Sequence, residues 1–287
     1  MDSRQDFTDR QTMTAGDFEY FHYRDDPHLE VKYHNHDFYE VYFFISGKVT
    51  YTIEGKSYRL RPGDLVLVNN RELHRPEVEP GQTYERIVLW IRPYFLESNS
   101  SPDTNLTTCF EGEGPLRHHL LRLDEEVLAG VRGALSRLGK ACAGSGYGSR
   151  LLQESILKEL LVLINRASLD TESHTAIEDM KYNEKVSCII DFINENLAGD
   201  LSLDALSRQF YTSRYHLLRE FKKHAGCTLH QFIQRKRLIA AKEMLRRGGS
   251  VSDACNACGF GDYSNFIRAF RLNFGAPPGR YARNMNT

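Results

Sequence analysis

Two segments in the C-terminal third of the chain repeat one pattern, and this repeat limits the possible folds more than any other feature. "YHLLREFKKHAG" spans residues 215–226, and "SNFIRAFRLNFG" spans residues 264–275. Each segment places two apolar residues four positions apart, on one face of a helix, and each ends in a Gly, which favours helix termination. The sequence therefore predicts two related helices, each with one buried face.

Each repeated helix follows a shorter helical pattern and a tight turn, which together predict a helix-turn-helix unit. The first turn lies at 210–212 and Ser213 is the expected N-cap of the helix after it. Gly259 suits the second turn, and Asp262 is the expected cap of the second repeated helix.

The outward faces of the two repeated helices carry Arg, Lys, Tyr and small polar residues. Forked guanidinium donors suit guanine edges in the major groove, and cations suit phosphates, so these faces predict two DNA-reading helices. Single Arg or Lys residues can also contact only phosphate or water. Arg219 and Arg268 hold the same position in the two copies and are the favoured pair. The predicted DNA-binding residues are Arg214, Tyr215, Leu218, Arg219, Lys222, Tyr263, Ser264, Asn265, Arg268 and Arg271.

The segment between the two units, "TLHQFIQRKRLIAAKEMLRRGG", predicts one long helix. Thr228 and Gln231 form a capping box, and basic residues precede Gly248 and Gly249. About 18 helical residues span roughly 27 Å, close to the ~34 Å between successive major-groove faces. One chain is therefore expected to contact two adjacent turns on one side of DNA.

The formal net charge of −1 hides an uneven distribution. Residues 183–287 carry 16 Lys and Arg against 9 Asp and Glu, a net of +7, which leaves −8 for residues 1–182. The basic part is the nucleic-acid candidate.

Residues 17–93 read as short strands, and residues beyond 102 read as helices. "EVYFFI", "KVTYTI", "SYRL", "DLVLV" and "ERIVLWI" are rich in β-branched and aromatic residues and are separated by turn signals such as "EGK" and "RPGD". Strands at this spacing predict a sandwich or barrel. Asp124 is the expected cap of one following helix. A second helix, within 150–167, has an apolar stripe wide enough either to pack entirely in its own domain or to contact a second subunit.

The six Cys residues are scattered along the chain, and reduced thiols are expected. Cys255 and Cys258 resemble half of a zinc site, but no second pair follows at zinc spacing, so small buried helix residues are the better interpretation. No apolar run approaches the ~20 residues that cross a bilayer. We therefore expect no membrane contact and a cytoplasmic protein.

The last hundred or so residues resemble the DNA-binding domain of the AraC/XylS family of bacterial transcription regulators. The resemblance rests on "FKKHAG", "RLIAAKEML" and "CGFGDYSNFIRAFRLNFGAPPGRYAR". It implies base contacts from both repeated helices. The chain departs from the family pattern at Ala254 and Cys255, and at Tyr211, where Gly is frequent.

A second resemblance lies near the N-terminus, in "YHNHDFYEVYFF". His34, His36 and Glu40, with Gly47 after them, resemble the first motif of the cupin barrels, and "RPGD" with a later His74 resembles the second, although His74 comes later than usual. "HDFYE", "FFISG" and "LRPGD" also resemble AraC-type sensor domains. The stretch reads as a β-strand, which places His34, His36 and Glu40 on one side, and they converge if that side faces a barrel interior.

Three interpretations of this cluster remain open. Cupin metal sites use three His and one Glu, a set suited to Fe, Mn, Ni or Zn, which here means His34, His36, Glu40 and His74. The same interior can instead bind a polar effector, or the histidines can only hydrogen-bond within the barrel. The predicted effector-binding residues are His34, His36, Glu40, Tyr42 and His74.

Together these patterns predict a two-domain α+β protein. We expect a cupin-like effector-binding β-barrel at 1–110, a helical dimerisation segment at 111–167, a linker at 168–182, and an all-α domain of two helix-turn-helix motifs joined by a linker helix at 183–287. The expected function is sequence-specific transcription regulation in response to a small molecule, with a sugar or sugar derivative favoured by the family resemblance.

The expected partners are double-stranded promoter DNA, the effector, a second copy of the chain, and RNA polymerase if the protein activates. No cofactor is expected beyond the possible divalent metal. One alternative is a metal-dependent cupin enzyme with a DNA-binding tail. Another is a constitutive regulator whose barrel only dimerises.

Overall fold

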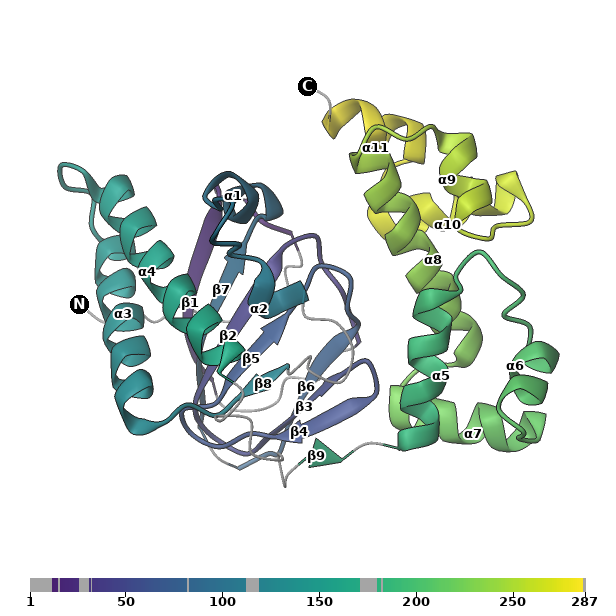
Figure 1. Ribbon diagram of the computed structural model, residues 1–287, viewed down its shortest axis with the longest axis horizontal. Helices are drawn as coiled ribbons and strands as arrows, with labels where there is room; N and C mark the ends of the chain where they lie inside the picture. Colours follow the sequence, from purple (N-terminus) through teal and green to yellow (C-terminus); the bar gives the residue numbers. More distant parts are fainter. Residues whose placement is uncertain are drawn as a thin grey trace. The chain divides into compact units, whose positions relative to one another are not determined.

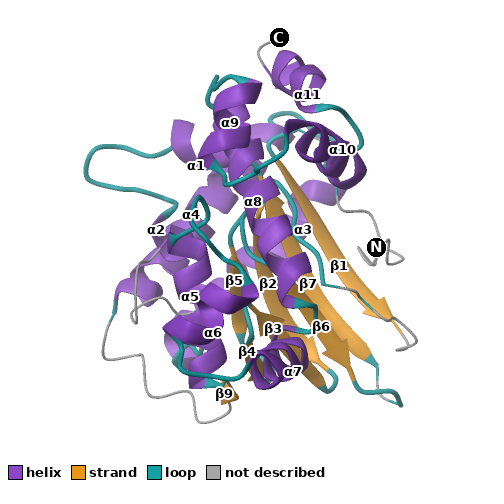
Figure 2. Ribbon diagram, turned by 90° about the vertical axis from the view of Figure 1, so that its right-hand side faces the viewer, coloured by secondary structure: helices purple, strands orange, loops and turns teal. Residues whose placement is uncertain are grey.

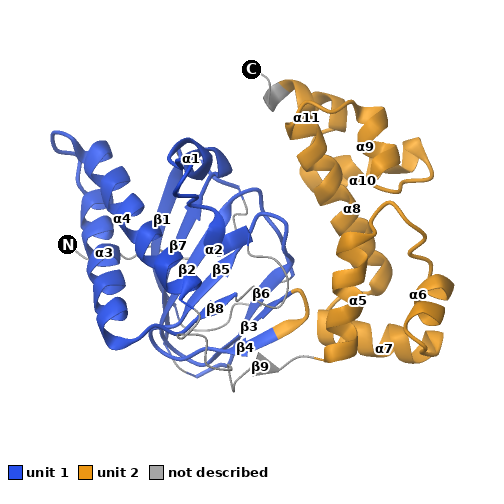
Figure 3. Cartoon of the chain, in the orientation of Figure 1, with its two compact units in different colours: residues 1–53, 57–181 blue, residues 54–56, 182–287 orange. Residues whose placement is uncertain are grey.

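The computed structural model describes residues 12–14, 16–25, 31, 33–81, 83–111, 119–170, 180–181 and 183–285. It divides into two compact units (Figure 3). Unit 1 comprises residues 1–53 and 57–181, and unit 2 comprises residues 54–56 and 182–287. Most of the linker expected at 168–182 lies outside the described residues.

Unit 1 is built on two antiparallel sheets (Figure 1). The five-stranded sheet has the order β1-β7-β2-β5-β8 and the four-stranded sheet the order β6-β3-β4-β9. The strands are β1 (Phe18–Asp25), β2 (Tyr39–Ser46), β3 (Val49–Ile53), β4 (Lys56–Arg59), β5 (Leu65–Val68), β6 (His74–Val78), β7 (Tyr84–Ile91), β8 (Leu120–Leu121) and β9 (Met180–Lys181).

The predicted β-rich, cupin-like fold class is confirmed, with two differences in detail. Within the described residues the strands form two separate sheets rather than one closed barrel, linked near one end by an isolated bridge between His34 and His74. The five-stranded sheet also extends beyond residue 110, because β8 pairs with β5. A two-residue strand after a long connection has no period-2 pattern to reveal it.

Strand β2 is buried on both faces, and its alternate residues contribute to two cores. Tyr39, Val41 and Phe43 pack into the core beneath the helices of unit 1. Tyr42 and Phe44 point to the opposite side and pack between the two sheets. Because both faces are covered, this strand reads as an almost continuous apolar run.

Four helices of unit 1 lie against the outer face of the five-stranded sheet (Figures 1 and 2). They are α1 (Pro93–Ser98), α2 (Thr108–Glu111), α3 (Glu125–Ala143) and α4 (Ser149–Leu169). Asp124 caps α3 as predicted, since its side chain accepts a hydrogen bond from the Val127 amide. The apolar stripe of α4 is largely buried within unit 1, whereas Leu152 at its N-terminal end is 54% exposed. Most of the stripe therefore packs within its own unit.

All the regular elements of unit 2 in its described part are helices, apart from residues 54–56, a turn that ends in the first residue of β4. Its helices are α5 (Glu184–Glu195), α6 (Leu203–Gln209), α7 (Arg214–Ala225), α8 (Leu229–Arg246), α9 (Val251–Ala257), α10 (Tyr263–Phe274) and α11 (Pro278–Met285). The caps predicted at Ser213 and Asp262 and the capping box of Thr228 with Gln231 are all present. The predicted tandem helix-turn-helix architecture is confirmed.

The two Cys residues of α9 and its C-cap pack in an apolar core. Cys255 and Cys258 are both buried, in one cluster with Phe266 and Phe270. Burial raises the pKa of the Cys258 thiol to about 11, with a further rise from Cys255, so the thiol stays protonated at neutral pH. The structure places them as small buried residues, as the sequence predicted.

The two helix-turn-helix turns differ in backbone strain. Gly259 has a φ of +77°, and a Cβ there would lie 2.5 Å from the Leu197 carbonyl oxygen, so only Gly fits without movement. Tyr211, in the first turn, has a φ of 47° and a side chain that is 95% exposed. This left-handed conformation explains why Gly is favoured at that position.

No helix in the described ranges is long and apolar enough to cross a membrane.

Gly259→Ala is expected to destabilise unit 2 by about 2 kcal/mol or more. Ala is disfavoured in the left-handed conformation, and its Cβ would also clash with the Leu197 carbonyl oxygen. Gly261→Ala is the matched control, since a Cβ at Gly261 meets nothing within 4 Å. Urea unfolding followed by far-UV circular dichroism measures both. Equal unfolding midpoints for the two variants would contradict the packing described for Gly259.

Candidate functional site

All ten predicted DNA-binding residues lie on exposed positions of α7 and α10. Leu217 and Phe221 of α7, and Phe266 and Phe270 of α10, point into the core. Tyr215, Leu218 and Tyr263 are 75%, 42% and 50% exposed, although each is a large hydrophobic side chain. Exposed apolar side chains beside Arg and Lys form a surface able to contact both thymine methyl groups and phosphates.

The matched arginines of the two helices are only loosely held. Arg219 donates through Nε to Glu220 Oε1 at 3.1 Å, and Arg268 donates through Nη2 to Asn265 Oδ1 at 2.7 Å. Both contacts are exposed to solvent, where such pairs contribute little stability. The guanidinium groups are therefore available to exchange these partners for a nucleic acid. DNA contact by these residues stays a prediction.

One exposed residue of α7, His216, is missing from the predicted DNA-binding set. His216 of α7 aligns with Asn265 of α10, and both lie on exposed positions in the first turn of their helices. Aligning the repeats residue by residue gives this equivalence, so the signal was present in the sequence. His216 joins the candidate DNA-contacting residues.

Helix α8 connects the two helix-turn-helix motifs within unit 2. It contains 18 residues, Leu229–Arg246, as predicted. At 1.5 Å per residue its length is about 27 Å. Its buried residues include Phe232 and Leu245, near opposite ends, so the helix packs along most of its length.

In unit 1, His34, His36 and His74 meet at one place. One ring nitrogen from each residue lies within 4.8 Å of the others, and the ring centroids of His34 and His74 are 4.3 Å apart. The expectation that His34 and His36 lie on a strand with Glu40 is wrong, since β2 begins at Tyr39. The backbone bridge between His34 and His74 brings the histidines together instead.

The ring orientations of the two buried histidines are fixed by backbone carbonyls. His36 Nδ1 lies 2.8 Å from the Phe38 oxygen and His74 Nδ1 lies 3.0 Å from the Glu72 oxygen. A carbonyl only accepts, so both Nδ1 atoms carry the proton. Among the described residues neither Nε2 atom has a hydrogen-bond partner, although both are buried.

Burial, reinforced by the neighbouring His34 and His36, holds the pKa of His74 well below its usual value. His74 is therefore neutral at neutral pH, and its Nε2 atom presents a lone pair to the cluster.

Glu40 lies beside this cluster as a buried carboxylate. The Tyr51 hydroxyl donates to Oε1 at 2.8 Å and the Trp90 indole donates to Oε2 at 3.0 Å. Burial alone raises the pKa of Glu40, but the neighbouring histidines and the Tyr51 hydroxyl lower it to about 2. The carboxylate is thus ionised, and its Oε2 atom lies 3.5 Å from His36 Nε2.

Tyr42 shares the interior between the sheets but not the histidine cluster. Its hydroxyl pairs with the hydroxyl of Tyr84, and its ring lies 5.0 Å from that of Tyr51. The structure therefore brings together four of the five predicted effector residues and places Tyr42 next to their supporting Tyr51.

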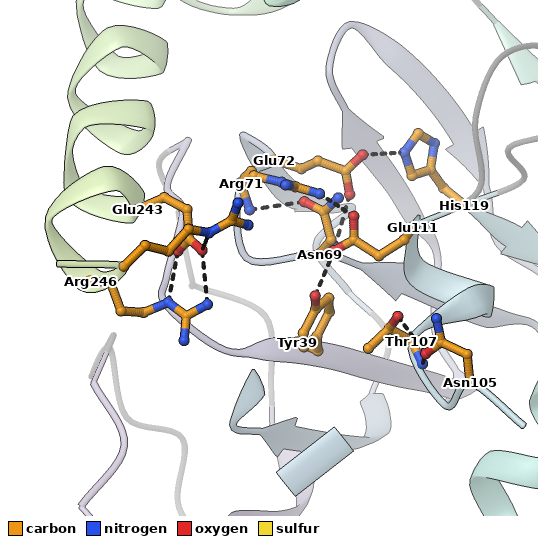
Figure 4. A network of polar contacts seen from close by, with 11 residues as sticks. Tyr39, Asn69, Arg71, Glu72, Asn105, Thr107, Glu111, His119, Glu243 and Arg246 are labelled. Atoms are coloured by element: carbon orange, nitrogen blue, oxygen red, sulfur yellow. Dashed lines mark hydrogen bonds and ion pairs between the residues drawn. The ribbon is translucent and has the colours of Figure 1, made fainter. Parts of the chain in front are cut away.

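Hydrogen bonds hold the turn that precedes His74, and Figure 4 shows the contact between Glu72 and His119 in this network. The Glu72 carboxylate accepts from the Asn69 amide at 2.9 Å and lies 2.6 Å from His119 Nε2, while the Glu72 carbonyl orients His74. Nearby, Glu111 accepts from the Tyr39 hydroxyl at 2.5 Å and pairs with Arg71. The sequence did not predict the contacts of Glu72 with His119 or of Glu111 with Tyr39 and Arg71, because these partners are far apart in the chain.

A cavity of about 630 Å³ lies on the opposite side of β2, between the sheet and α3. Its apolar floor includes Phe43, Ile45 and Ile87, and its polar residues include Ser136 and Lys140. This cavity has room for a small molecule. No sequence pattern indicated it, since its walls come from separate strands and a helix.

Comparison with known proteins assigns both units. Residues 16–161 match the family model described as an AraC-like ligand binding domain, and residues 206–284 match a helix-turn-helix domain. The "HTH-type transcriptional activator RhaS" of Salmonella schwarzengrund is 30% identical over 249 residues, which cover 85% of each chain. RhaS of Salmonella typhimurium is 29% identical over 246 residues, again covering 85% of each.

Among solved structures, ToxT from Vibrio cholerae aligns over 96% of this chain and 99% of its own, with 14% identity and a TM-score of 0.38.

Tyr51→Phe is expected to destabilise unit 1 by about 1.5 to 3 kcal/mol, because it removes a buried hydrogen bond to the charged Glu40. Tyr147→Phe is the control, since Tyr147 is fully exposed. The only tryptophan of the chain, Trp90, touches the same carboxylate, so its fluorescence follows unfolding of this site. A Tyr51→Phe protein as stable as the control would contradict the network.

Proposed function

The chain belongs to the AraC family of transcription regulators, and we propose that it recognises promoter DNA through α7 and α10 and responds to a small molecule bound by its N-terminal unit. Family membership rests on the match of 16–161 and on relatives that are 30% identical over most of both chains. The predicted class, a regulator rather than an enzyme, is confirmed by relatives named as transcriptional activators.

The observation that carries the DNA proposal is the equivalence of the two reading helices. Arg219 and Arg268 hold the same place in helices of the same length, each capped by an N-terminal side chain and ended by a left-handed Gly. A guanidinium in this position can donate two parallel hydrogen bonds to a guanine edge. Phosphate contacts from Lys222 and Arg271, each in the last turn of its helix, would fix the orientation.

The cavity beside α3 is one candidate site for the effector, and the buried polar interior that contains Tyr42 is the other. A sugar or sugar derivative is the proposed class, because hydroxyl groups suit His, Glu, Tyr and Ser side chains. A bound molecule alters regulation only if it binds one arrangement of the protein better than another.

The remaining parts of the proposal concern partners. Activation through RNA polymerase is supported by the activator names of the relatives. A homodimer formed through the helices of unit 1 is supported by Leu151 and Leu152, which are 71% and 54% exposed on α4. Because promoter DNA lies in the bacterial cytoplasm, the protein is proposed to act there.

Arg219→Ala and Arg268→Ala are each expected to weaken binding to a DNA sequence selected by the wild type from a random pool, by about 1 to 3 kcal/mol. Arg219→Lys keeps the charge but loses the paired donors, so a base contact predicts a loss for Lys as well. Lys185→Ala on α5 is the control for charge, since Lys185 is exposed outside both reading helices. Unchanged affinity and unchanged sequence preference in both Ala variants would refute the assignment.

A screen of sugars and sugar derivatives by thermal shift tests the effector. A ligand at about 100 times its Kd stabilises the protein by about 2.7 kcal/mol, a shift of several degrees in Tm. Loss of the shift in Tyr42→Phe would place the ligand in the interior, and loss in Ser136→Leu would place it in the cavity. If no compound raises Tm, a constitutive regulator whose N-terminal unit only dimerises replaces the proposal.

A further inference from the structure

We propose that His34, His36 and His74 bind one divalent transition-metal ion such as Zn²⁺, with Glu40 held outside the coordination shell as a charge-balancing neighbour. The inference goes beyond DNA and small-molecule binding, because it assigns an inorganic ligand to the histidine cluster. It also departs from the cupin pattern of three His and one Glu.

The first observation is the state of the two buried imidazoles. His36 is 3% exposed and His74 is 0% exposed, and each uses Nδ1 to donate to a backbone carbonyl. Metal-binding histidines are oriented in the same way, by a hydrogen bond from the nitrogen that does not bind the ion. The Nε2 atoms are then left with nothing to accept from in the described residues, which is costly for buried polar atoms.

The second observation is convergence. Three ring nitrogens lie within 4.8 Å of one another, one from each histidine. Nitrogens bound to one tetrahedral ion at about 2.0 to 2.1 Å would be about 3.4 Å apart, so shifts on the order of 1 Å complete the site. His34 is only half-buried, so its ring has the most room to make this adjustment.

The third observation concerns Glu40. Both of its carboxylate oxygens already accept hydrogen bonds, from Tyr51 and from Trp90. These bonds hold the carboxylate in place, and its oxygens are not among the ligand atoms that converge within 4.8 Å of one another. A negative charge 3.5 Å from His36 Nε2 nevertheless favours a cation at the cluster without a direct bond. Imidazole ligands suit Zn²⁺, Ni²⁺ and Cu²⁺, and three of them leave a coordination position open.

Titration of the EDTA-stripped, full-length chain tests the proposal, with Zn²⁺ followed by calorimetry and Co²⁺ followed by visible absorption. The expected result is one ion per chain, with a change in Trp90 fluorescence because its indole contacts Glu40. His34→Ala and His36→Phe should each weaken binding at least about 100-fold, more than the loss typical of supporting residues. His22→Ala is the matched control, a histidine of the same unit paired with Glu85 outside the cluster.

Glu40→Gln tests whether the carboxylate is a metal ligand or only a charged neighbour of the site. One ion per chain, bound about 10- to 100-fold more weakly, is expected for a supporting neighbour. Loss of stoichiometric binding would instead make Glu40 a ligand and overturn the three-histidine assignment.

The proposal also fails if the wild type binds no ion, or if the cluster variants bind as tightly as His22→Ala. Because His34 is half-buried, His34→Ala keeps the test valid even if His36→Phe does not fold. DNA binding is measured on the same ion-free sample, so absent metal binding with intact DNA binding refutes this inference alone.

Discussion

The double burial of strand β2 is the constraint on which unit 1 depends. One face of the strand packs beneath helices α1 to α4 and the other packs between the sheets, so almost every side chain must be apolar. Glu40 is the buried exception, and its charge is tolerated because the Tyr51 hydroxyl and the Trp90 indole donate hydrogen bonds that replace part of the lost hydration. The charged residue of this apolar strand, Glu40, therefore lies beside the histidine cluster.

A different constraint applies to unit 2, because helices α7 and α10 are built with the same local arrangement. Each reading helix needs a cap at its start, an inward aromatic residue and a left-handed Gly at its end. Gly226 and Gly275 meet the last need with φ values of 72° and 75°. The turns before the helices are less uniform, since Gly259 packs against backbone while Tyr211 accepts a strained conformation in solvent. The first turn thus tolerates a side chain that the second excludes.

The parts of this structure that depend on local sequence were predictable, and the parts that depend on distant pairing were not. Caps at Ser213, Thr228 and Asp262 follow from residues within one turn of each helix. The sequence predicted which histidines lie together, but not how the fold brings them together. The contact between His34 and His74 is a backbone bridge between residues far apart in the chain. The cavity beside α3 and the pairing of β8 with β5 depend entirely on such tertiary contacts.

Helix α8 has a consequence for how strongly the protein holds its target. If α7 and α10 both contact DNA as proposed, α8 makes the second contact intramolecular once the first has formed. Effective concentrations for short connections are on the order of millimolar, and a stiff helix restricts the search further. Under that proposal, two individually weak contacts would together hold the protein on one stretch of promoter. Because α7 and α10 differ in sequence, such a pair of contacts would also distinguish the two orientations of that stretch.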